Sequence, residues 1–168
     1  SNMLFCGPPG TGKTMTAQAF ARRLYEENVA DHIIVRGAAF KRLNSPAKAQ
    51  TALADILRLA QTNSRPVILV FDEAETLFPD RDSSYATEMT HDLTTTLLSF
   101  FENAIDLRVM FILSTNYPER IDTALLNRID PSNYIYFTKP TQRERLLLLT
   151  TYLKQEISER GLGISDEV

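Results

Sequence analysis

A glycine-rich segment near the amino terminus is the first part of the sequence with a recognisable chemistry. Residues 7–14 read Gly-Pro-Pro-Gly-Thr-Gly-Lys-Thr and match the pattern G-x-x-x-x-G-K-[ST]. Glycines let backbone N–H groups curl around phosphate oxygens, and a following helix directs its positive end at the same anion. We expect Lys13 to reach the β- and γ-phosphates and the Thr14 hydroxyl to bind Mg²⁺. The residues expected to bind the nucleotide are Gly7, Pro8, Pro9, Gly10, Thr11, Gly12, Lys13, Thr14 and Met15.

Two adjacent carboxylates, Asp72 and Glu73, follow an apolar run over residues 67–71. In a chain that also carries a phosphate loop, Asp72 is expected to hold the hydration shell of Mg²⁺. Mg²⁺ needs only one or two protein ligands, so Thr14 and Asp72 suffice as the metal site. Glu73 is expected to polarise the attacking water, which favours hydrolysis over transfer to a bound acceptor.

Two further residues are candidates for catalysis, Asn116 and Arg128. Asn116 ends another apolar run and is expected to orient the water or contact the γ-phosphate; alternatively it only begins the turn before Pro118. Arg128 lies at the end of a short helix that the topology places away from the phosphate site of its own chain. It is therefore expected to supply transition-state charge to a neighbouring subunit, unless it is a surface arginine paired with Asp130.

The elements that must position these residues alternate along the chain. Apolar runs predict strands over residues 3–6, 33–35, 66–71, 109–113 and 134–137. Helical periodicity predicts helices over residues 14–27 and 46–60, and a third that follows the polar loop Pro79–Thr87 and has Leu93, Leu97, Phe100 and Phe101 on its apolar side. A last helix, capped by Thr141, is expected to run to about Arg160 and to end at Gly161. This alternation predicts an α/β fold with a parallel sheet covered by helices on both faces, in three layers.

Composition limits the classes of protein that fit. The 168 residues, 43% of them hydrophobic, are enough for one globular domain. With 18 basic against 21 acidic residues, the chain carries no signal for binding nucleic acid or an anionic membrane. The single cysteine, Cys6, excludes an internal disulfide and a cysteine-based zinc site, and fits the cytoplasm or another reducing compartment. No apolar run is long enough to cross a membrane and no signal peptide is visible.

Taken together, the motifs resemble those of the AAA+ ATPases over essentially the whole chain. Gly7–Thr14 resembles the Walker A motif, Val67–Glu73 the Walker B motif, Asn116 sensor 1, and Asp122–Asp130 the arginine-finger region. The resemblance implies a P-loop NTPase fold with a five-stranded sheet in the order 5-1-4-3-2, ATP with Mg²⁺ as cofactors, and a homo-oligomeric ring, usually a hexamer. It also implies which residues act within one subunit and which act on the next: Lys13, Thr14, Asp72, Glu73 and Asn116 in cis, and Arg128 in trans.

The sequence departs from the family pattern in three places. Only Arg128 matches the arginines of the finger region, and Arg120 lies outside that pattern. The segment Lys41–Ala47, which corresponds to the family's pore loop, contains no aromatic residue, and Phe40 just before it is expected to belong to the core. The segment that precedes the first strand in the family, and the helical lid that follows, are both missing. Residues 1–160 are therefore expected to form the large α/β nucleotide-binding subdomain of a longer protein, and residues 161–168 to begin a connection to the lid.

The expected function is Mg²⁺-dependent ATP hydrolysis, coupled in a ring to the remodelling of a protein partner. The alternative is a nucleotide-dependent assembly scaffold with little hydrolysis, which the missing pore aromatic and the sparse arginines favour. A small-molecule kinase is disfavoured because Glu73 suits activation of a water. The sequence does not identify the partner, and it leaves open whether other parts of the protein attach to a membrane.

Overall fold

The first part of the chain folds as a parallel sheet enclosed by helices. The structure is a computed structural model that describes residues 2–103 and 108–160. The chain divides after Phe137 into two compact units, which are described separately. In the first unit the five strands follow the order β2-β3-β4-β1-β5, and every neighbouring pair is parallel. Read from the other edge this is 5-1-4-3-2, so the expected α/β fold and strand order are confirmed.

The strands form where apolar and β-branched residues are concentrated. β3 is the clearest case, because five of its six residues are buried, as expected for a strand covered on both faces. All five predicted strands are present, with ends that shift by one or two residues. Their bounds are β1 Met3–Cys6, β2 Asp31–Arg36, β3 Val67–Asp72, β4 Val109–Thr115 and β5 Tyr134–Tyr136.

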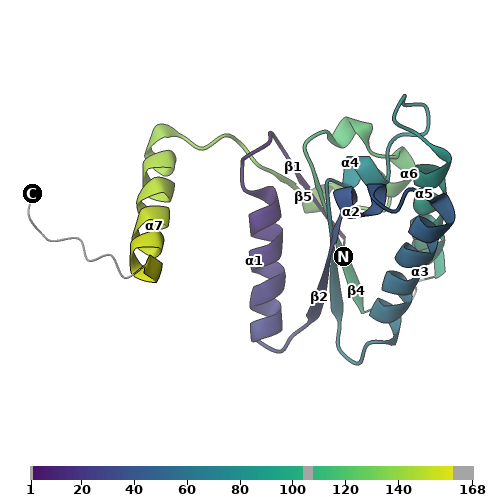
Figure 1. The fold of residues 1–168 in the computed structure, drawn as a ribbon, viewed down its shortest axis with the longest axis horizontal. Helices are drawn as coiled ribbons and strands as arrows, with labels where there is room; N and C mark the ends of the chain where they lie inside the picture. Colours follow the sequence, from purple (N-terminus) through teal and green to yellow (C-terminus); the bar gives the residue numbers. More distant parts are fainter. Residues whose placement is uncertain (1, 104–107, 161–168) are drawn as a thin grey trace, which may run out of the picture. The chain divides into compact units, whose positions relative to one another are not determined.

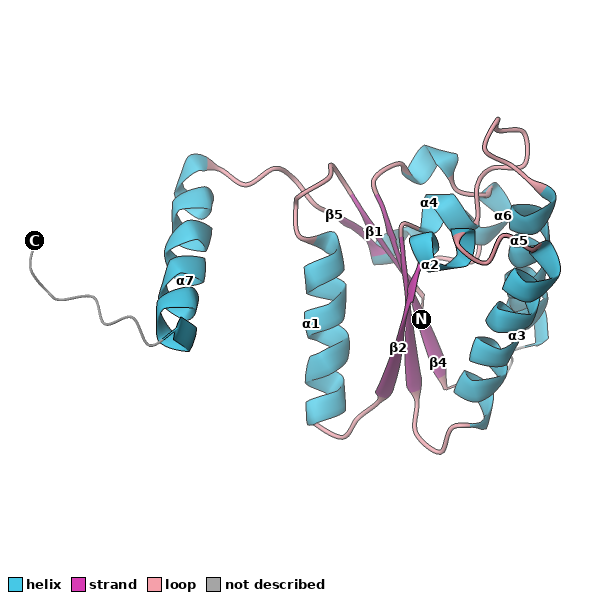
Figure 2. Ribbon diagram, viewed as in Figure 1, coloured by secondary structure: helices cyan, strands magenta, loops and turns pink. Residues whose placement is uncertain are grey.

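Helices cover both faces of the sheet, which confirms the three layers (Figure 1; Figure 2 shows the same view by secondary structure). Helix α1 lies on one face, and α3 and α5 lie on the other. The helix α3 begins at Pro46, where the Ser45 hydroxyl accepts a hydrogen bond from the Lys48 N–H. The helices α2 and α4 were not predicted, because four or five residues are too few to show a helical period. The bounds are α1 Lys13–Glu26, α2 Gly37–Lys41, α3 Pro46–Thr62, α4 Ala74–Leu77, α5 Glu88–Asn103 and α6 Thr123–Leu126, with 3-10 turns at Pro118–Arg120 and Pro131–Asn133.

The sheet separates two hydrophobic clusters. Successive side chains of a strand point to opposite faces, so Leu69 and Phe71 pack on the side of α3 and α5 while Ile68 and Val70 pack on the side of α1. Phe40 is also buried, as expected. The sheet and its helices therefore form a rigid base for the loops at the carboxyl ends of the strands.

The second unit contains helix α7, Gln142–Arg160. Thr141 caps it as expected: the Glu144 N–H donates to the Thr141 hydroxyl, and the Thr141 N–H donates to the Glu144 carboxylate at 2.7 Å. The run Leu146–Leu149 is 48–66% exposed, because none of the other described residues of this unit packs over it. The expected end of the helix at Gly161 lies outside the described residues.

Candidate functional site

The glycine-rich segment forms the turn from β1 into α1, and two of its glycines are required by the backbone. Gly7 has φ +146°, and a Cβ atom there would lie 2.1 Å from the carbonyl oxygen of Phe137. Gly12 has φ +92° and caps α1 without any side-chain hydrogen bond. The N–H groups in the first turn of α1 are therefore available to an anion bound in the loop.

Lys13 ties this loop to the end of β4. Its side chain is buried, and its Nζ donates to the carbonyl oxygens of Gly7 at 2.7 Å and Pro8 at 2.8 Å. A third hydrogen bond, also 2.7 Å, goes to the Asn116 side-chain oxygen. The structure thus brings together Lys13 and Asn116, which lie 103 residues apart in the sequence.

Glu75, in α4, also reaches this group, and the sequence analysis missed it as a site residue. Its Oε1 accepts a hydrogen bond from the Asn116 backbone N–H at 3.4 Å, and its Oε2 is buried without a partner among the described residues. Burial lowers the pKa of Lys13, while the charges of Glu75 and Asp72 act in the opposite direction. No local pattern marks Glu75, because Asp72 ends β3 and Glu75 lies in α4, so the three-residue spacing that brings side chains together on one helix does not apply.

Thr14 and Asp72 meet in the same way, across 58 residues of sequence. The Thr14 hydroxyl donates to the Asp72 carboxylate at 2.7 Å, which joins the first turn of α1 to the end of β3. The described residues include no group of three or more His, Cys, Asp or Glu placed to hold a metal. Mg²⁺ does not need one, because it takes most of its ligands from water and phosphate. The Thr14 hydroxyl oxygen and the Asp72 carboxylate oxygen therefore fit a magnesium site.

Glu73 occupies an uncommon backbone conformation between β3 and α4. Its φ is +55°, in the left-handed region, which costs a residue other than glycine about 1–2 kcal/mol. The turn is held by Thr76, whose N–H and hydroxyl both donate to the Glu73 carbonyl, at 2.9 and 2.8 Å. The Glu73 side chain is exposed. Strain of this kind is typical of functional positions.

Arg128 is not brought to the phosphate loop of its own chain. Its carbonyl oxygen accepts a hydrogen bond from the Asn2 side chain, and Asn2 precedes β1 at the end opposite Gly7. The five residue-to-residue steps from Asn2 to Gly7 span roughly 16 Å of extended chain. The Arg128 side chain is exposed. This placement agrees with the topology argument but does not test the role of Arg128 in a neighbouring subunit.

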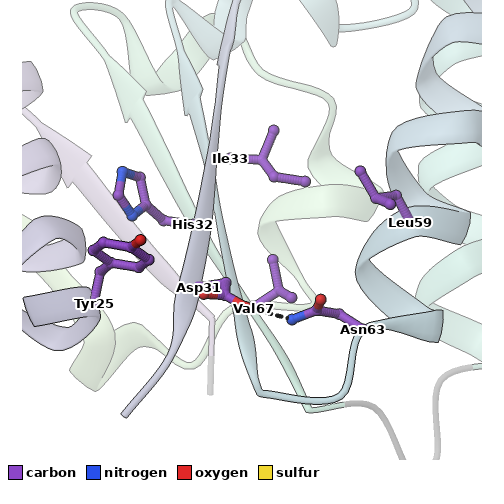
Figure 3. Close-up of a pocket in the computed structure, with 7 residues that line it drawn as sticks. All are labelled: Tyr25, Asp31, His32, Ile33, Leu59, Asn63 and Val67. Carbon is purple, nitrogen blue, oxygen red and sulfur yellow. Dashed lines mark hydrogen bonds between the residues drawn. The ribbon is translucent and has the colours of Figure 1, made fainter. Parts of the chain in front are cut away.

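Apart from this site, a cavity of about 280 Å³ lies at the other end of the sheet (Figure 3). Asp31 and Val67 line it at the first residues of β2 and β3, whereas the phosphate loop follows the last residue of β1. Figure 3 shows Tyr25 and His32 on one side of β2, and Leu59 and Asn63 on the other. Asp31 accepts a hydrogen bond from Asn63 at 2.7 Å and pairs with Arg65. These contacts tie the β2 edge to α3, and the cavity is not part of the phosphate site.

Comparisons with known proteins agree with this geometry. The family model described as "ATPase family associated with various cellular activities (AAA)" matches residues 3–137, which include every candidate site residue. The chain is 33% identical over 166 residues to the ATPase family gene 2 protein of Saccharomyces cerevisiae, covering 98% of this chain and 20% of that protein. It is 32% identical over 158 residues to the ATPase family AAA domain-containing protein 3A homolog of Drosophila melanogaster, covering 93% of this chain and 24% of that protein. The chain therefore spans about a fifth to a quarter of the length of these relatives.

A solved structure shows the same fold. The FIGL-1 AAA domain in complex with ADP superposes with a TM-score of 0.72 and 21% sequence identity, over 92% of this chain and 48% of that one. Across residues 2–103 and 108–160, no helix is long and apolar enough to span a bilayer. The family match over residues 3–137, on a sheet with the expected strand order, confirms the resemblance drawn from the motifs: the chain belongs to the AAA family of ATPases, as a nucleotide-dependent ATPase module.

Proposed function

We propose that this chain binds ATP with Mg²⁺ and hydrolyses it, and that a ring of such subunits couples hydrolysis to the remodelling of a protein partner. The observation that carries the proposal is the convergence of three strand ends on one loop. The Lys13–Asn116 contact joins the loop after β1 to β4, and the Thr14–Asp72 contact joins α1 to β3, both at 2.7 Å.

Each residue of this group has a distinct role in the proposed reaction. Lys13 and the loop N–H groups bind the phosphate oxygens, and Thr14 and Asp72 hold Mg²⁺. When bound, Mg²⁺ neutralises charge on the phosphates. Glu73 accepts the proton of the attacking water, and Asn116 orients that water. Glu75 positions Asn116, because the Asn116 backbone N–H donates a hydrogen bond to the Glu75 carboxylate.

Two substitutions test the assignment of binding and hydrolysis to different residues. Lys13→Ala should abolish nucleotide binding, whereas Glu73→Gln should retain ATP and lose roughly a hundredfold or more in the rate of phosphate release. Glu26→Gln is the matched control, because it changes an exposed glutamate of α1 that pairs with Arg22, outside the phosphate loop. Turnover by Glu73→Gln at the wild-type rate would show that another group acts as the base.

The assembly scaffold with little hydrolysis remains the second candidate, favoured by the single arginine in the finger region. Steady-state ATPase activity measured against protein concentration separates the two. If Arg128 acts in trans, specific activity rises as subunits assemble, and Arg128→Ala flattens that rise while Arg58→Ala, on the exposed side of α3, does not. Nucleotide-driven assembly without measurable turnover would favour the scaffold.

A further inference from the structure

Another cavity, of about 360 Å³, lies beside the candidate nucleotide site but is not lined by the phosphate loop. Its walls come from α2, the segment around α4, the start of α5 and the turn after β4. We call it the Arg120 pocket. The lining residues that matter here are Lys41, Glu75, Tyr85, Met89, Tyr117 and Arg120.

Two aromatic rings hold Arg120 in this pocket. Its guanidinium lies 4.1 Å from the centroid of the Tyr117 ring and 5.4 Å from that of Tyr85. Both are distances at which a cation is attracted to the face of an aromatic ring. The backbone is held as well, since the Arg120 N–H donates to the Tyr117 carbonyl and the Asp80 N–H donates to the Arg120 carbonyl. The guanidinium is therefore positioned before any ligand arrives.

Within the described part of the chain, no hydrogen bond or ion pair engages the guanidinium N–H groups of Arg120 or the ammonium of Lys41. The one carboxylate among the lining residues, Glu75, accepts from the Asn116 N–H. Arg65 also lies over a tyrosine ring, but unlike Arg120 its guanidinium pairs with a carboxylate, that of Asp31.

We propose that the Arg120 pocket binds the carboxylate of an acidic side chain in an extended segment of a partner protein. A planar guanidinium fork matches a carboxylate, and the flanking tyrosine rings and Met89 offer apolar contact to the aliphatic stem of a glutamate. Two cations in a chain of net charge −3 are too few for a nucleic-acid backbone, which is bound through several phosphates. The proposal extends the proposed function by giving the chemistry of the partner, but it concerns binding and does not require ATP turnover.

The test is fluorescence anisotropy with the purified protein and a labelled ten-residue peptide of alternating glutamate and glycine. The same peptide with glutamine in place of glutamate is the control ligand. Arg120→Ala should weaken binding roughly ten- to a hundredfold, the effect of losing a charge-assisted hydrogen-bonded pair. Arg120→Lys should recover only part of it, because lysine keeps the charge but loses the fork and the stacking. Arg58→Ala, an exposed arginine of α3, should bind within about twofold of the wild type.

Lys13→Ala separates this site from the phosphate loop. That variant should lose nucleotide but keep the peptide, so the proposed function and this proposal can fail independently. Four results would overturn the pocket: no saturable binding by the wild type, equal binding of the glutamine peptide, equal affinity of Arg120→Ala and Arg58→Ala, or loss of the peptide in Lys13→Ala. Tighter binding of a single-stranded oligonucleotide that displaces the peptide would assign the pocket to nucleic acid instead. Unchanged melting temperatures of the variants show that each one is folded.

Discussion

Gly7 is the position at which the phosphate loop and the sheet constrain each other most directly. An added Cβ would lie 2.1 Å from the Phe137 carbonyl oxygen and 3.0 Å from its carbon, where ordinary contacts begin at 3.4 Å. Gly7→Ala therefore forces β1 and the residue after β5 apart by roughly 1 Å or more. The hydrogen bond from the Phe137 N–H to the Cys6 carbonyl, 2.7 Å long, lies at this place.

The cost of Gly7→Ala follows from these contacts. The positive φ costs alanine about 1–2 kcal/mol, and weakening one or two backbone hydrogen bonds costs about 1 kcal/mol each. The lower entropy of the unfolded alanine chain returns about 0.5–1 kcal/mol. The net loss is about 1–3.5 kcal/mol, which lowers the melting temperature by roughly 2–14 °C for a chain of this size.

Gly10→Ala is the matched control, and thermal unfolding followed by far-ultraviolet circular dichroism without nucleotide is the assay. Gly10 lies in the same loop and has φ +73°, but a Cβ there meets nothing within 4 Å. Only the conformational cost remains, less the gain from the unfolded chain, so the melting temperature should fall by less than about 6 °C. If Gly7→Ala melts no lower than Gly10→Ala, the close approach to Phe137 does not limit this position and the reasoning is wrong.

Three further predictions concern charged or titratable groups outside the nucleotide contacts. Asp122 is 2% exposed and accepts from Arg81 Nε at 2.7 Å and from a backbone N–H at 2.9 Å, so Asp122→Ala should cost about 2–3 kcal/mol in urea unfolding, with an unchanged m-value. Hydrogen bonds from Arg65 hold the pKa of Asp31 below its usual 3.8. The stability that these bonds give is therefore present above that pH and is lost as the pH falls through the lower pKa of the folded state. The difference in unfolding free energy between the wild type and Asp31→Asn should shrink on going from about pH 5 to pH 3. Burial raises the pKa of the Cys6 thiol, so Ellman's reagent at about pH 8 should label it only as fast as the protein opens, and rapid labelling of the native protein would contradict that environment.

The sequence alone predicted those features that depend on neighbouring residues. Strands and helices follow from local apolar periods, and for that reason all five strands and the long helices were located to within a few residues. The phosphate loop is contiguous, and the positive φ values of Gly7 and Gly12 are what its glycines predict. The helices α2 and α4 escaped prediction because each is only about one turn long.

The tertiary structure decided which distant residues meet. Parallel strands place their carboxyl ends at one edge of the sheet, and this brings Lys13 to Asn116 and Thr14 to Asp72 across 103 and 58 residues. The hydrogen bond between Asn116 and Glu75, and the contact of Arg120 with the Tyr85 ring, join separate segments of the chain at that edge, and no local pattern marks them. Local preferences act over a few residues, whereas the packing of helices on both faces of the sheet determines where its loops lie. The chemistry of the loop could thus be read from the sequence, but its partners could be found only in the folded chain.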